Sequence, residues 1–73
     1  MNYYEQFNIF TGRSTRYVSV YIFPEIKQTH ILVYNTKGKR LYYVFLDGKN
    51  IRNKQKLPEY LNKIIDNIKI LFL

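Results

Sequence analysis

Polar and apolar residues alternate along much of the chain, which is the pattern of strands with two different faces. Residues 16–23 show it most clearly, with valine and isoleucine on one side and tyrosine, serine and phenylalanine on the other. Residues 29–36 and 40–47 are equally rich in β-branched and aromatic side chains, so they predict two further strands. Residues 3–10 alternate more loosely and are interpreted as a short first strand. Residues 51–54 are interpreted as a brief strand or a loop.

Turn signals separate these segments. Gly12 lies in a run of small polar residues, and Pro24 ends the strand that precedes it. The segment Asn-Thr-Lys-Gly-Lys predicts a hairpin turn with Gly38 in the left-handed conformation. Residues 47–50, Asp-Gly-Lys-Asn, predict a second tight turn, so the strands are expected to pair antiparallel.

The period changes near the end of the chain. Over residues 57–73 the large apolar residues recur three and four positions apart, as in an amphipathic helix. Pro58 suits the first helical position, where a missing N–H group costs little. We therefore expect one α+β domain over residues 1–73. It comprises a small antiparallel sheet of three to four strands and one C-terminal amphipathic helix packed on one sheet face.

One helix can cover only one face of a sheet, yet the predicted strands are apolar on both sides. The uncovered face is expected to be an interface, because monomers rarely expose large apolar patches. This face could join two copies of the chain or bind another protein. The apolar end of the helix could also join two copies. A third use is the stacking of single-stranded bases. The predicted interface residues are Tyr21, Phe23, Leu32, Tyr34 and Tyr42.

The formal charge is +7 at pH 7, from 12 basic and 5 acidic residues. Such a charge on a small surface favours an anionic partner. Nine of the 12 basic residues fall in predicted turns or at strand ends, where side chains can reach a curved phosphate backbone. The predicted nucleic-acid-binding residues are Arg13, Arg16, Lys37, Lys39 and Arg40, with Lys49 and Arg52 at the other end of the third strong strand.

The sequence offers little for catalysis. It has no cysteine, and its one histidine, His30, lies inside a predicted strand that contains no acid. The five acids are dispersed, and the three glycines are isolated turn residues rather than a phosphate-binding loop. We therefore expect no enzyme activity, no metal site and no cofactor. No apolar run is long enough to predict a membrane span.

These observations predict a small basic, non-enzymatic nucleic-acid-binding protein that docks through its hairpin loops as a homodimer. DNA is expected before RNA, because a sheet with a basic hairpin and a following helix resembles domains that lay a three-stranded sheet in the DNA major groove. The alternative is a protein-interaction module, such as an inhibitor encoded by a phage, virus or plasmid, that meets an acidic protein surface. A composition rich in Ile, Asn, Lys, Tyr and Phe and without alanine indicates a low-GC bacterial or archaeal host. The first residues do not resemble a signal peptide, so we expect the chain in the cytoplasm of that host.

Overall fold

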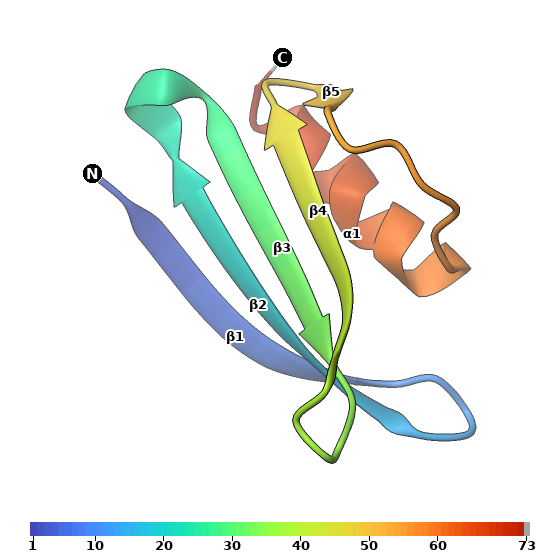
Figure 1. Ribbon diagram of the computed structural model, residues 1–73. Helices are drawn as coiled ribbons and strands as arrows, with labels where there is room; N and C mark the ends of the chain where they lie inside the picture. The colour runs from blue at the N-terminus through green and yellow to red at the C-terminus, as the bar shows by residue number, and fades with distance from the viewer. Residues whose placement is uncertain (73) are drawn as a thin grey trace.

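The computed structural model describes residues 1–72 and has the small α+β fold that was expected. An antiparallel sheet, whose strands follow one another in chain order, precedes one long helix (Figure 1). The sheet has five strands rather than three to four. The strands are β1 (Tyr3–Phe10), β2 (Thr15–Phe23), β3 (Gln28–Tyr34), β4 (Arg40–Asp47) and β5 (Asn50–Ile51), and the helix is α1 (Glu59–Ile70).

β1 is a full strand of 8 residues that pairs with β2 along its whole length. Its alternation is loose because it lies at the edge of the sheet, where only Phe7 and Ile9 are half-buried. A short 3₁₀ helix, Pro24–Ile26, links β2 to β3 and ends at Lys27, which has a left-handed backbone with φ of 54°. The loop expected after Pro24 is therefore a tight helical turn.

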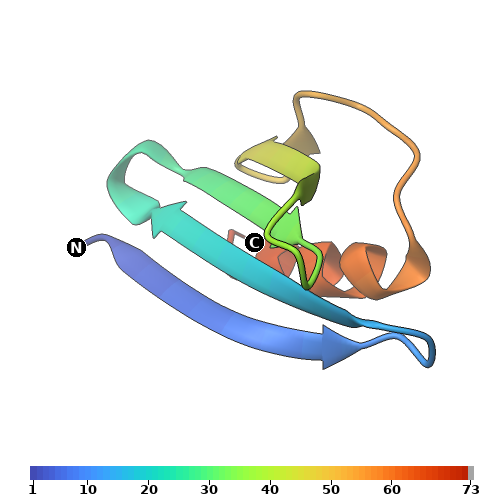
Figure 2. The ribbon, with the colours of Figure 1, turned by 60° about the horizontal axis from the view of Figure 1, so that its bottom comes forward.

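The core lies between one face of the sheet and α1. Antiparallel pairing places Ile31 opposite Val20 on one side and opposite Val44 on the other, so a row of aliphatic side chains crosses the sheet. Leu61, Ile65 and Ile68 of α1 pack on this face. Figure 2 shows the helix lying on one side of the sheet only. The buried core residues are Val18, Val20, Ile22, Ile31, Val33, Val44, Leu46, Leu61, Ile65 and Ile68.

α1 is shorter than the periodicity predicted. Pro58 is not its first helical residue, because its backbone is extended, with φ of −70° and ψ of 159°. Its carbonyl nevertheless accepts hydrogen bonds from the amides of Leu61 and Asn62, each at 3.1 Å, so Pro58 caps the helix. The helix ends at Ile70, and the last residue of the predicted range, residue 73, lies outside the described residues.

The two edges of the sheet differ. Beside β4, the segment after β5 supplies side-chain hydrogen bonds in place of a strand. The Asn53 side chain accepts from the Phe45 amide at 2.9 Å and donates to the Tyr43 carbonyl at 2.7 Å, and Gln55 donates to the same carbonyl at 2.8 Å. These bonds satisfy the β4 backbone. Among the described residues, no strand pairs with the outer edge of β1.

Candidate nucleic-acid interface

The β1–β2 turn and the β3–β4 turn lie at the same end of the sheet, because antiparallel strands in chain order reverse direction at alternate ends (Figure 1). We call this the hairpin end. It carries five of the seven predicted nucleic-acid-binding residues. Four of them are exposed and Arg16 is half-buried. The five are Arg13, Arg16, Lys37, Lys39 and Arg40.

The tip of the β3–β4 hairpin is held by one side chain. The Asn35 carboxamide oxygen accepts hydrogen bonds from the backbone amides of Lys37 and Lys39, both at 2.9 Å. Gly38, between them, has φ of 82°, the left-handed conformation that the sequence predicts and that glycine adopts without a steric cost. The turn therefore presents its two lysines from an ordered backbone, which lowers the entropy that a bound phosphate would have to offset.

Two arginines of the hairpin end, Arg16 and Arg40, point to opposite faces of the sheet. Arg16 is paired with Ile9 and lies on the helix side, where it lines a small pocket with Tyr42 and Tyr60. Arg40 lies on the other side, with its guanidinium 5.9 Å from the centre of the Tyr43 ring. A bulge between Val33 and Tyr34 sets the place of Arg40. Cations therefore surround the hairpin end rather than line one face.

Acidic residues are absent from the chain segments that form this end. The sequence has no aspartate or glutamate in residues 6–24 or 26–46. At the opposite end, Glu25 forms an ion pair with the N-terminal amine at 3.1 Å, and Asp47 pairs with Arg52 at 3.0 Å. Glu5 and Asp47, the acids of the two hairpins, thus lie away from these turns. Glu59 lies between Pro58 and Tyr60, which line the same pocket as Arg16. One acid beside five cations leaves the hairpin end positive, which favours an anionic ligand there.

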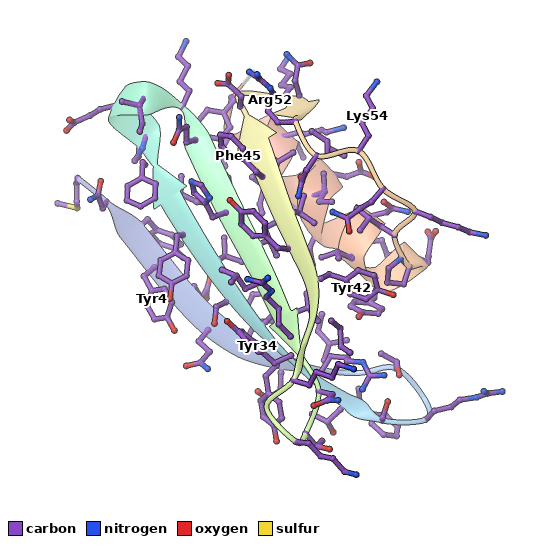
Figure 3. The ribbon with its side chains drawn as sticks, in the orientation of Figure 1. Tyr4, Tyr34, Tyr42, Phe45, Arg52 and Lys54 are labelled. Carbon is purple, nitrogen blue, oxygen red and sulfur yellow. The ribbon has the colours of Figure 1, made fainter. Side chains whose placement is uncertain are left out.

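Lys49 and Arg52 do not join this cluster. They follow β4, whose 8 residues separate them from Arg40. A strand of that length spans roughly 25 Å. Arg52 is also paired with Asp47. Lys54 lies on the loop that runs back from β5 towards α1, at the side of the sheet (Figure 3).

The second predicted site, the aromatic interface, lies mostly on the face that α1 does not cover. We call this the open face. Strand register places Tyr21 and Phe23 of β2 and Leu32 and Tyr34 of β3 there. Tyr42 was assigned wrongly to this face. It pairs with buried Val33 and packs against the core on the helix side.

Several rings of the open face were not predicted as site residues: Tyr4, Phe10, Tyr17, His30, Tyr43 and Phe45. His30 is half-buried at the centre, with its Nδ1 atom 2.7 Å from the Tyr43 hydroxyl and its ring stacked on Phe45 at 4.8 Å between centroids. The alternation of β4 puts Tyr43 and Phe45 on the face opposite Val44. The predicted pattern left open which face the helix covers.

An apolar groove lies on the helix side, between β1 and the end of α1. It has a volume of 690 Å³ and is lined by residues that include Phe7 and Ile22 of the sheet and Ile64 and Ile68 of the helix. Leu71 also lines the groove and is 66% exposed. The groove exists because the helix axis follows the inner strands and leaves the helix side of β1 partly uncovered (Figure 1).

Within residues 1–72, no group of three or more His, Cys, Asp or Glu side chains is placed to hold a metal ion. Nor does this part of the chain contain a helix that is long and apolar enough to cross a membrane. Comparisons with models of protein families, with curated proteins and with solved structures find no match to the chain.

Proposed function

We propose that this chain is a small non-enzymatic nucleic-acid-binding protein that docks through its hairpin end. The observation that carries the proposal is the gathering of Arg13, Arg16, Lys37, Lys39 and Arg40 at one end of the sheet, in and beside two turns that contain no acid. Phosphate contacts of this kind fix a protein on a nucleic acid without reading its sequence. DNA is the expected partner, in the cytoplasm of the host cell.

The test is a salt titration of binding, measured by fluorescence anisotropy with labelled random-sequence DNA in duplex and single-stranded form. Five cations that neutralise about four to six phosphates give a plot of log affinity against log salt with a slope of about −4 to −5 on duplex DNA. A slope near zero, or no binding at low salt to either form, would overturn the proposal.

The protein is further proposed to act as a homodimer, joined through the groove between β1 and α1. Exposed Ile70 and Leu71 stand at the end of the same helix that lines the groove, so two copies can each offer an apolar edge to the other. The unpaired edge of β1 adjoins this surface and carries neither lysine nor proline, the residues that commonly block edge pairing. Sedimentation at tens of micromolar tests this, because a monomer with an intact fold would contradict it.

A protein-interaction module is the second candidate function. It is favoured by the aromatic open face, since tyrosine combines a large contact area with a polar tip and is enriched at protein interfaces. In that case the hairpin end would steer the chain to an acidic protein surface and would act mainly on the association rate. Absence of nucleic-acid binding in the anisotropy titration would leave this candidate in place of the first.

A further inference from the structure

The open face of the sheet is an unusual surface for a basic protein, because every long strand contributes aromatic rings to it. The rings project from the side opposite α1, and Tyr4 and Tyr34 lie on the side turned towards the viewer in Figure 3. Register places the following residues on this face: Tyr4 and Phe10 on β1; Tyr17, Tyr21 and Phe23 on β2; His30 and Tyr34 on β3; Tyr43 and Phe45 on β4.

These rings pack against one another but are not sealed from solvent. Tyr4 and Tyr21 form a pair with centroids 4.6 Å apart, and they are 52% and 38% exposed. His30, Tyr43 and Phe45 are half-buried and stacked near the centre of the face. Parallel rings of this kind can extend their stack onto an added flat ring, because each π-face attracts another at a separation of a few ångströms.

Charge decides which partner suits this face. Among the strand residues that register places on it, the only acid is Asp47, which lies at the far corner and is paired with Arg52. Arg40 joins the face directly to the hairpin end, since its guanidinium lies over the Tyr43 ring. A second copy of the chain would add another formal charge of +7 beside this surface, whereas a polyanion would neutralise the charge already there.

We propose that the open face is a stacking platform for the bases of a single-stranded nucleic acid whose phosphates are held by the hairpin end. Unpaired bases expose the flat surfaces that aromatic side chains stack on, and such contacts tolerate any sequence. A duplex keeps those surfaces stacked inside, so it can use only the phosphate contacts. The inference rests on the proposed nucleic-acid function and narrows it to single strands as the preferred ligand.

The chain offers a matched pair of variants for the test, Tyr4→Ala and Tyr3→Ala. The two tyrosines are adjacent on β1, are 52% and 51% exposed, and each donates a hydrogen bond to the residue two positions later. They differ in the face that they occupy, because Tyr4 pairs with Tyr21 on the open face and Tyr3 pairs with buried Ile22 on the helix side. Tyr21→Ala is a second variant of the open face.

Affinity is measured by anisotropy with a labelled thymidine oligonucleotide of about 15 nucleotides and with a labelled duplex of the same length. We expect the wild type to prefer the single strand. Tyr4→Ala and Tyr21→Ala should each weaken single-strand binding about fivefold or more. They should leave duplex binding unchanged. Tyr3 lines the groove between β1 and α1, so Tyr3→Ala is judged by the ratio of single-strand to duplex affinity, which should stay at the wild-type value. Because the chain has eight tyrosines and no tryptophan, quenching of tyrosine fluorescence by the unlabelled oligonucleotide gives an independent signal of stacking.

The two proposals fail in different ways. If the wild type binds duplex and single strand alike and Tyr4→Ala behaves as Tyr3→Ala does, the stacking platform is overturned while binding through the hairpin end stands. If the wild type binds neither form at low salt, both are overturned. A dimer that Tyr4→Ala dissociates, in a protein without preference for single strands, would show that a second copy occupies the open face and would also overturn the platform.

Discussion

The two faces of the sheet are both apolar, but they are built from different residues. The covered face is aliphatic: Val18, Ile31 and Val44 are fully buried beneath α1. The open face carries tyrosine, phenylalanine and histidine, which remain half-buried or exposed and keep polar atoms at their tips. Branched aliphatic chains fill a closed core densely, whereas aromatic rings offer contact area to a partner that arrives later. The difference indicates that one face supports folding and the other is available for binding.

The largest effect is expected from neighbouring residues of β3 that lie on opposite faces. Ile31 is fully buried, so Ile31→Ala should lower the free energy of unfolding by about 3 kcal/mol, which can unfold so small a domain. The milder Ile31→Val should cost about 1 kcal/mol and keep the protein measurable. Leu32 is half-buried on the open face, and Leu32→Ala should cost about 1 kcal/mol or less. Urea denaturation checks these values. An equal loss of unfolding free energy in Ile31→Ala and Leu32→Ala would contradict the difference between the covered face and the open face.

A smaller effect, of opposite sign, is expected at the one polar side chain of the covered face whose oxygen is unsatisfied. Thr29 lies between Ile22 and Leu46, is fully buried, and its hydroxyl has no hydrogen-bond partner within residues 1–72. Burying such a group costs free energy, so Thr29→Val should stabilise the protein by about 1 kcal/mol. A loss of stability in urea denaturation would mean that the hydroxyl is satisfied in solution.

The smallest effect concerns pH. Burial, followed by the neighbouring Tyr42 phenol, raises the pKa of Tyr60 above its ordinary value of 10.0, while the Arg16 guanidinium acts in the opposite direction. Because the pKa of Tyr60 is higher in the folded state than in the unfolded state, the folded state favours the protonated phenol. The resulting stability is present below pH 10.0 and is lost as pH rises through the folded-state pKa. Thermal midpoints should therefore fall less above pH 10.0 in Tyr60→Phe than in the wild type. An equal fall in both would contradict the burial of Tyr60.

Local signals were sufficient to predict β2, β3, β4, the turns beside them and the presence of the helix. Gly38 has the left-handed conformation that its hairpin requires, and the period of the last segment predicted a helix over residues 57–73, of which the structure has Glu59–Ile70. No single segment predicts the order of the strands in the sheet. Short turns between successive strands nevertheless favour a sheet in which neighbouring strands pair antiparallel in chain order. The strand status of β1 depended on its pairing with β2, which local alternation indicated only weakly.

The residues of the candidate sites could not all be assigned to a sheet face from the local sequence pattern. Tyr42 was placed on the wrong face because both sides of β4 are apolar, and only its pairing with Val33 shows that it meets the helix. The hairpin end was foreseeable, since alternate turns of an antiparallel sheet share an end. The opposite orientations of Arg16 and Arg40 were not foreseeable, because they depend on strand register and on the bulge after Val33.

The central claim is that the hairpin end holds phosphates and contributes little to folding. Two variants of equal charge test it most directly: Lys37→Gln/Lys39→Gln/Arg40→Gln, and Lys49→Gln/Lys54→Gln/Lys69→Gln as the control. Each removes three positive charges, but the control residues follow β4 or lie on α1. Affinity for single-stranded and duplex DNA is measured across a range of salt concentrations, and thermal unfolding is measured on the same samples.

The account predicts that the hairpin-end variant weakens binding to every sequence and flattens the salt slope by up to about 3, with an unchanged thermal midpoint. The control should keep most of the wild-type slope, because its lysines lie away from the hairpin end. Equal losses in the two variants would show that net charge alone attracts DNA, and unchanged binding in the hairpin-end variant would contradict the claim outright.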